Sequence, residues 1–385
     1  MGYDYTYMGV HNEKVENMGI KRKVLILIVI CLNIFFSSGC YKYQAVEELA
    51  IAIGLGYDIE KNDGVIYADT SETLLFKGNK QISNEVMTGR SNTIYTTQHE
   101  LQSKMPKKWV LGGEIIYIIS EERAKFGIKD LIDALLRNQI RKDNAYIVIS
   151  KQRAQDVFNL KPHMYSTVSE EVYSSLEYLY MENFFKINNE AYNVLQMYYQ
   201  EGRKIVIPYI EIIENRIQVT GLALFEEDKM VKKIDMGEAR LINLLRNNNV
   251  ISSIGITSEK ADEYYDLICK SKLKVKVIYD EDKFNYDITI NIRAELVTDS
   301  IDKKILSAKE APKIENLVKK HLEKALDEEI EKMQSVYKID WLDLGKYAAA
   351  EFGRNKNYSS DENFCDAKIN VNVKVKISTF GQVQK

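Results

Sequence analysis

The chain has 385 residues, of which 45% are hydrophobic and 28% are charged. These values are typical of a folded protein and exclude a disordered stalk, and the length predicts two or three domains of roughly 150 residues each. The net charge is −3, with acidic and basic residues interspersed, so the chain as a whole has no basic field, and we expect no nucleic-acid partner.

The N-terminal segment resembles a bacterial export signal. A basic cluster at residues 21–23 precedes 13 mostly apolar residues at 24–36, and small residues lead to Cys40. The apolar run is shorter than the roughly 20 residues that a membrane-spanning helix needs, so it fits a removable signal better than an anchor. We therefore predict a signal peptide over residues 1–39 and attachment of a lipid to Cys40.

Two features of this segment leave alternatives open. Met18 lies at a normal signal length before Cys40, so translation could start there. Ser37 occupies the position where the usual lipoprotein motif has Leu. An ordinary signal peptide and an uncleaved anchor are the alternative interpretations.

Residues 40–200 have the pattern of a mixed α/β domain. Residues 49–58 and 65–68 read as a hairpin around an Asp-Gly turn, the strongest short hairpin signal. Residues 114–120 and 145–149 are short, solidly apolar runs, typical of strands covered on both faces. Helices are expected between them, the first ending at Gly127 and the next with Leu131, Leu135 and Leu136 inward. Residues 74–108 are polar, and a single helix is expected there.

Residues 167–199 predict one or two helices rich in tyrosine. Thr167 and Glu170 have the spacing of a capping box, which satisfies the free amides of a first helical turn. Large amphipathic rings commonly pack against a neighbouring domain with their hydroxyl groups in water. A platform that stacks on a ligand is the alternative interpretation.

Residues 201–385 form the second predicted domain, and a small separate middle unit over 201–250 is an alternative division. Strands are expected at 205–210 and 217–225, followed by a short helix at 237–245. Because Pro208 cannot donate to a sheet ladder, the first of these strands should be an edge strand or begin late.

The last third has the clearest pattern. Residues 284–296 and 369–377 alternate between apolar and polar, as strands with one dry and one wet face do. A stripe with a period of 3.6 predicts a long helix over 314–337. We therefore predict an α+β fold, with a mixed α/β N-terminal domain and a C-terminal antiparallel sheet packed on one long helix.

No set of catalytic residues emerges from the sequence. The four histidines are isolated, and no spacing typical of a metal site occurs. Gly54 and Gly56 follow a strand without the third glycine of a nucleotide loop, so a tight turn or bulge is the better interpretation. We expect no enzymatic activity, no cofactor and no metal. Cys269 and Cys365 could pair, although two unpaired thiols are favoured.

Several motifs, in order, resemble the Ger(x)C family, the lipoprotein C subunits of spore germinant receptors. The resemblance runs from Cys40 almost to the C-terminus. Two departures are Tyr41-Lys42 in place of a Trp-Asp pair, and a missing tryptophan between Asn363 and Ile369. The matching segments are Glu48-Leu49-Ala50-Ile51 with Gly54, Gly56 and Asp58; residues 115–121; Ile207-Pro208-Tyr209-Ile210; residues 221–225; and residues 338–345.

The resemblance implies an elongated, non-enzymatic, lipid-anchored accessory subunit of three domains. Such subunits sit on the outer face of the spore inner membrane, with integral-membrane A and B subunits, in receptors that sense small nutrients. Docking against A and B, rather than direct binding of a small molecule, is therefore the expected role, and the tyrosine-rich region from Tyr173 to Tyr199 is a candidate contact surface. A solute-binding lipoprotein is the main alternative, and a surface hydrolase is a third.

Overall fold

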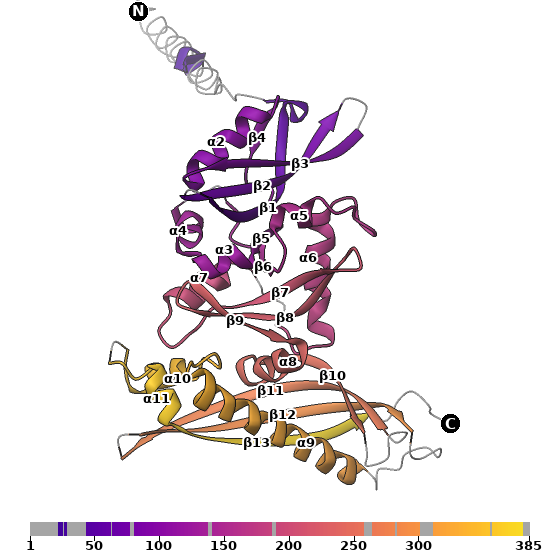
Figure 1. The fold of residues 1–385 in the computed structure, drawn as a ribbon, viewed down its shortest axis with the longest axis vertical. Helices are drawn as coiled ribbons and strands as arrows, with labels where there is room; N and C mark the ends of the chain where they lie inside the picture. The colour runs from indigo at the N-terminus through magenta and orange to yellow at the C-terminus, as the bar shows by residue number, and fades with distance from the viewer. Residues whose placement is uncertain are drawn as a thin grey trace, which may run out of the picture. The chain divides into compact units, whose positions relative to one another are not determined.

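The computed structural model describes residues 22–25, 27–28, 44–62, 64–77, 81–137, 141–186, 190–257, 264–281, 283–300, 311–354 and 356–379 (Figure 1). The chain divides into residues 1–46 and a compact unit, residues 47–385, which contains both sheets. Cys40 and most of the predicted signal peptide lie outside the described residues.

The first sheet has nine strands in the order β3-β2-β1-β5-β6-β7-β8-β9, and β4 also pairs with β1. The two ends of the sheet are antiparallel, whereas its centre, from β1 through β5 and β6 to β7, is parallel. The strands are β1 (Leu49–Asn62), β2 (Gly64–Lys77), β3 (Gln81–Ser91), β4 (Lys108–Val110), β5 (Ile116–Ser120), β6 (Tyr146–Ser150), β7 (Val206–Ile213), β8 (Arg216–Glu226) and β9 (Lys229–Asp235).

Helices cover the parallel centre of this sheet on both faces. Every residue of β5 and β6 is buried, because alternate side chains of each strand enter two separate cores. One core includes residues of α3, α4 and α7, and the other includes residues of α5 and α6. The helices are α2 (Ile94–Lys104), α3 (Glu121–Phe126), α4 (Lys129–Arg137), α5 (Ala154–Phe158), α6 (Val168–Tyr178) and α7 (Ala191–Tyr199).

Several sequence predictions for this region are confirmed. β1 and β2 form the predicted hairpin. Gly127 is the C-cap of α3, and Thr167 and Glu170 form a complete capping box at the start of α6. The register of β1 against β2 shifts between Ala52 and Gly54, which is the bulge that the Gly-x-Gly pair predicts.

Three expectations for this region need correction. The helix expected within residues 74–108 is present as α2, but the end of β2 and all of β3 and β4 also lie there; the stretch reads as polar because β3 is a largely exposed strand at the end of the sheet. Of the two alternatives for the strand that contains Pro208, the edge strand is wrong, because β7 lies between β6 and β8; the late start agrees with its pairing to β6, which begins at Tyr209, directly after Pro208. Leu136 does not face inward but is 50% exposed.

The second sheet has the order β10-β11-β12-β13 and follows the helix α8 (Met236–Arg246). Its strands are β10 (Ile251–Thr257), β11 (Tyr264–Asp280), β12 (Lys283–Asp299) and β13 (Lys368–Thr379). β12 and β13 confirm the two alternating segments, whereas the sequence interpretation missed β10 and β11. Both of these strands alternate between buried and exposed residues in the same way over most of their length.

The α+β fold class is confirmed, but the second sheet is not wholly antiparallel. β10, β11 and β12 are antiparallel neighbours, whereas β12 and β13 run parallel. The long helix α9 (Ala311–Lys332) connects this parallel pair. The crossover carries the chain back along the sheet to the end at which β12 begins, so β13 enters beside β12 in the same direction.

α9 packs on the dry side of this sheet and also covers its edge. Its stripe, which includes Val318, Leu322 and Leu326, belongs to the same core as Ile290, Ile292 and Val373 of the sheet. On the edge, Glu323 Oε1 accepts a hydrogen bond from the Val373 amide and Glu315 Oε1 accepts one from the Ile377 amide, each 2.9 Å long. Outward-facing edge amides are therefore satisfied by the helix, which blocks pairing with another chain.

The rest of the chain completes this region. α9 continues into a π-helical turn, Met333–Tyr337, and ends at Lys338 in the left-handed conformation, with φ 57°. Two short helices, α10 (Gly345–Phe352) and α11 (Asp361–Asp366), lead to β13. The predicted domain boundary near residue 200 stays a prediction; the first sheet continues past it to Asp235.

Candidate functional site

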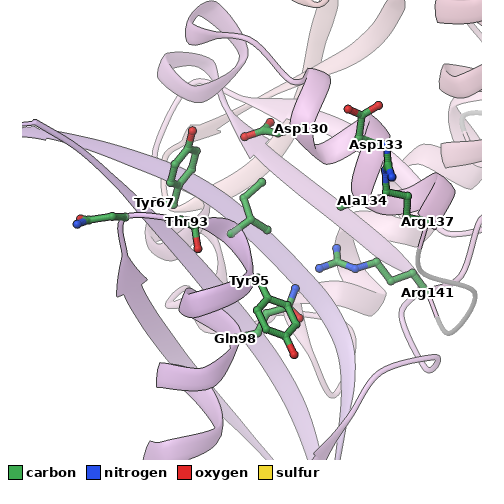
Figure 2. A pocket seen from close by; sticks show the side chains of 11 residues that line it. Tyr67, Thr93, Tyr95, Gln98, Asp130, Asp133, Ala134, Arg137 and Arg141 are labelled. Atoms are coloured by element: carbon green, nitrogen blue, oxygen red, sulfur yellow. The ribbon is translucent and has the colours of Figure 1, made fainter.

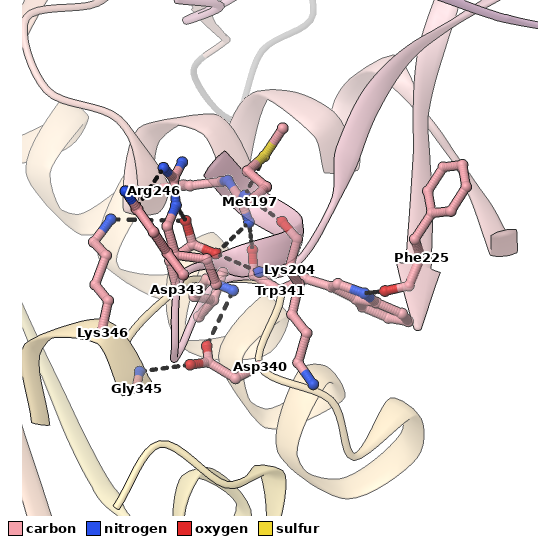
Figure 3. A network of polar contacts seen from close by, with 12 residues as sticks. Met197, Lys204, Phe225, Arg246, Asp340, Trp341, Asp343, Gly345 and Lys346 are labelled. Atoms are coloured by element: carbon pink, nitrogen blue, oxygen red, sulfur yellow. Dashed lines mark hydrogen bonds and ion pairs between the residues drawn. The ribbon is translucent and has the colours of Figure 1, made fainter. Parts of the chain in front are cut away.

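A buried ionic network joins the segment after α9 to the first sheet (Figure 3). Asp343 is fully buried and lies 2.9 Å from Arg246 Nη1 and 3.1 Å from Arg203 Nε. Its Oδ1 also accepts a hydrogen bond from the Lys204 amide, 3.0 Å long. Arg246 in turn donates to the carbonyl oxygens of Trp341 and Lys204. The two guanidinium groups and the amide balance the charge of this buried carboxylate and satisfy its hydrogen-bonding capacity. Removal of one partner from a buried ion pair is strongly destabilising.

Two neighbours of Asp343 fix the same segment. The Trp341 indole is 2% exposed and donates to the Phe225 carbonyl oxygen, 2.8 Å away, at the end of β8. Asp340 accepts hydrogen bonds from the amides of Leu342 and Gly345, and burial raises its pKa to about 6. These contacts hold residues 338–345, one of the segments that resembles the family, against β8, α8 and the segment that precedes β7. The arrangement is structural rather than chemically reactive.

A cavity of about 620 Å³ lies between α2 and α4, beside the first sheet (Figure 2). Apolar and aromatic side chains share its wall with amides and charged groups. The lining residues are Tyr67, Asn92, Thr93, Ile94, Tyr95, Gln98, Asp130, Asp133, Ala134, Arg137 and Arg141. Such a mixture of apolar surface and a few polar groups is typical of small-molecule sites.

Arg141 is the most unusual group of this cavity. It is 7% exposed, and its guanidinium donates to the Tyr57 hydroxyl, while its Nε finds no hydrogen-bond partner in the described part of the chain. Among the described residues, no carboxylate lies within ion-pair distance of it. The nearby Asp69 accepts a hydrogen bond from Thr97, 2.6 Å long, and burial raises its pKa to about 7. The cavity could therefore hold a ligand.

The Gly54-x-Gly56 pair and Asp58 have packing and capping roles. A Cβ on Gly54 would lie 2.1 Å from Ser169 Oγ, and one on Gly56 would lie 2.6 Å from Ala154 Cβ, so only glycine fits. The Asp58 carboxylate accepts hydrogen bonds from the amides of Ala154 and Gln155 at the start of α5. Gly54 and Gly56 therefore lie at a bulge of β1 where helices pack closely against the strand.

The tyrosine-rich region does not form a single surface. Tyr178 on α6 is 58% exposed, and Tyr192 and Tyr199 on α7 are 49% and 56% exposed. α6 belongs to the core on one face of the first sheet and α7 to the core on the other. Tyr173 instead stacks against Tyr146 at 4.8 Å. The exposed rings therefore lie in two separate places, on opposite faces of the first sheet.

The remaining predictions concern the cysteines, a metal site and a membrane-spanning helix. Cys40, the predicted lipid-attachment residue, lies outside the described residues and stays a prediction. Cys269 is buried and Cys365 is half-buried, and both are free thiols. Within the described ranges, no three His, Cys, Asp or Glu side chains are placed to hold a metal ion. In the same ranges, we find no helix whose length and apolar content would let it cross a membrane.

Comparison with known proteins shows the family. The model of the "Spore germination protein N-terminal domain" matches residues 42–212, and the model "Spore germination B3/ GerAC like, C-terminal" matches residues 220–381. The chain therefore belongs to the GerAC-like family of spore germination proteins, as its motifs predict.

Individual relatives agree with this family. The chain is 22% identical to spore germination protein GerQC of Bacillus cereus over 307 residues, which cover 79% of this chain and 84% of that protein. It is 21% identical to spore germination protein B3 of Bacillus subtilis (strain 168) over 361 residues, or 90% and 95% of the two chains. The crystal structure of the GerBC protein matches with a TM-score of 0.55 at 16% identity, covering 85% of this chain and 98% of that one. The last likeness supports the fold.

Proposed function

We propose that this chain is the lipid-anchored C subunit of a nutrient germinant receptor, on the extracytoplasmic face of the spore inner membrane. The observation that carries the proposal is the match of both family models, in order, over residues 42–212 and 220–381. The body acts by docking against integral-membrane A and B subunits, without catalysis of its own.

A lipid on Cys40 supplies the mechanism for this docking. Membrane attachment restricts the search for partners to a surface and raises their effective concentration. Nine positions separate Cys40 from Leu49, the first residue of β1, and a chain of that length spans at most about 30 Å. A diacyl-type anchor brings two chains and holds firmly, whereas a single chain binds only marginally.

Replacement of Cys40 tests the anchor. In the native host, Cys40→Ala should move the protein from the membrane fraction to the soluble fraction, and mass spectrometry of the unchanged protein should find a lipid on Cys40. Cys31→Ala, a cysteine change within the predicted signal, is the matched control and should leave the protein in the membrane. Retention of Cys40→Ala in the membrane together with an unmodified Cys40 would overturn the anchor.

Purification from spore membranes tests the docking separately. An affinity tag at the C-terminus should recover A and B subunits with the chain, and the yield should fall in Cys40→Ala because the effective concentration falls. Recovery of the lipidated chain without either membrane subunit would contradict docking while leaving the anchor intact.

The cavity beside α2 favours one second function, the direct capture of a small molecule. The observation in its favour is the buried Arg141, which lines a cavity of about 620 Å³ and whose Nε has no hydrogen-bond partner among the residues that the structure describes. Calorimetry with amino acids and sugars separates the two functions. Stoichiometric binding that Arg141→Met abolishes would establish capture by this chain, and absence of binding would leave docking as its role.

A further inference from the structure

The exposed face of the second sheet carries a band of positive charge. The strand register places Lys270, Arg293 and Lys376 side by side on β11, β12 and β13, and the next row on the same face holds Lys272, Asn291 and Lys374. Lys274 follows on β11, opposite Thr289. We call the following six residues, all exposed, the basic band: Lys270, Lys272, Lys274, Arg293, Lys374 and Lys376.

The fold does not neutralise this band. Like charges directly opposite one another on neighbouring strands destabilise a sheet. Among the described residues, the only ion pair of the band joins Lys376 to Glu315 on α9, at 3.5 Å. Glu295 and Asp287 lie on the same face but in rows at either end of the band. The chain has a net charge of −3, so the clustering is a local feature that overall composition does not explain.

The centre of the band is hollowed. A depression of about 400 Å³ is lined by five of its cations and by the Asn291 side chain. Ammonium and guanidinium groups donate hydrogen bonds and accept none, and they match the oxygen atoms of a phosphate group. The depression therefore has the shape and the donors for a phosphate-bearing group.

The residue types on the exposed face of the second sheet indicate a lipid surface rather than a protein as the partner. Protein interfaces are depleted of lysine and enriched in aromatic residues at their centre, whereas the centre of this face is lysine, arginine and asparagine. Anionic lipid surfaces attract clusters of lysine and arginine without needing an apolar centre. We propose that the basic band binds the anionic phospholipid headgroups of a membrane surface. This contact is independent of the lipid predicted on Cys40, and each can fail without the other.

Vesicle binding by the chain from residue 40 onward, carrying Cys40→Ala to remove the lipid, tests the proposal. This chain keeps every strand of both sheets and all four hydrophobic cores. The band variant changes Lys270, Lys272, Arg293 and Lys374 to Gln. The control variant changes to Gln four exposed cations in the part of the chain that forms the first sheet and its helices: Lys77, Lys142, Lys161 and Arg216. Circular dichroism melts should show that both variants fold, since none of these side chains has an ion partner among the described residues.

Sedimentation with vesicles of phosphatidylglycerol and phosphatidylcholine gives the readout. The parent chain and the control variant should bind vesicles that contain phosphatidylglycerol, and neither should bind pure phosphatidylcholine. The band variant should bind at least tenfold more weakly, and added salt should weaken the binding of the parent. Equal losses in the two variants, or no binding of the parent, would overturn the proposal. Binding of soluble polyglutamate without binding of vesicles would overturn it in favour of an acidic protein partner.

Discussion

The two sheets use carboxylates in opposite ways. In the first sheet the carboxylates belong to strands and accept hydrogen bonds from the N-termini of helices: Asp58 caps α5, and Glu72 accepts from the amides of Val168 and Ser169 in α6. In the second sheet they belong to a helix and accept hydrogen bonds from a strand, as Glu315 and Glu323 do along β13. The first arrangement fixes helices on a covered sheet, and the second protects the edge of a sheet that has one face in water.

Glu72→Gln should have the largest effect. Glu72 is fully buried, and its two oxygens accept hydrogen bonds from the amides of Val168 and Ser169, the Ser169 hydroxyl and Asn84 Nδ2. A glutamine would turn its amino group toward some of these donors and would remove a charge that favours a helix N-terminus. We expect a loss of about 2–4 kcal/mol in the free energy of unfolding, measured by urea denaturation. A loss below 1 kcal/mol would contradict the capping role.

Changes at Glu315 and Glu323 should separate the two arrangements. Each of these carboxylates gives one oxygen to one strand amide, a bond that a glutamine oxygen can also accept. Glu→Gln at both positions should therefore cost little. Glu→Ala at both should lower the free energy of unfolding by about 0.5–1.5 kcal/mol for each bond, because water can reach the freed amides at the sheet edge.

The Glu→Ala chain should also associate, because its edge amides become available for pairing. Size-exclusion chromatography over a range of concentrations measures this association, and the Glu→Gln chain is the matched control. Equal behaviour of the Ala and Gln chains would show that α9 does not protect the edge.

Glu329→Gln should have the smallest effect, and a pH-dependent one. Glu329 on α9 is 5% exposed, and burial raises its pKa to about 7. Within the described ranges, its Oε1 has no hydrogen-bond partner. Because the folded state holds this proton more tightly than the unfolded state, the contribution of Glu329 to stability is present at low pH and is lost as pH rises through about 7. The variant should therefore be more stable than the parent at about pH 8, with the gain shrinking toward about pH 5.

Thermal melts of the two chains across this pH range measure the effect. Glu328→Gln, at an exposed neighbouring position whose side chain is 67% accessible, is the control and should show no such dependence. A constant difference between Glu329→Gln and the parent at all pH values would contradict the assignment.

The sequence predicted those parts of the fold in which the apolar or polar character of each residue matches its burial in the structure. The alternation over residues 284–296 and 369–377 marked β12 and β13, and the solid apolar runs marked β5 and β6. Polar and apolar residues also alternate along β11, with Lys270, Lys272 and Lys274 on the exposed face. The sequence therefore contains the pattern that identifies this strand as well. The motifs, taken in order, identified the family.

Features that depend on distant partners could not be read in this way. Glu72 contacts α6 from 96 positions away, and Asp343 contacts Arg203 from 140 positions away, so local pattern carries no information on either pair. The parallel direction of β13 depends on how the intervening chain crosses the sheet. The cavity beside α2 is likewise lined from segments as far apart as Tyr67 and Arg141.

The parallel pairing of β12 with β13 has a kinetic consequence. Asn370 contacts Asp287 across 83 positions of chain, and closing so large a loop costs entropy before any contact compensates for it. Contacts of high sequence separation slow the folding of a domain. Until β13 pairs with it, β12 exposes a long row of unpaired backbone N–H and C=O groups, with which a strand of another molecule could pair. The time that β13 takes to pair therefore influences how long each newly made copy is vulnerable to aggregation.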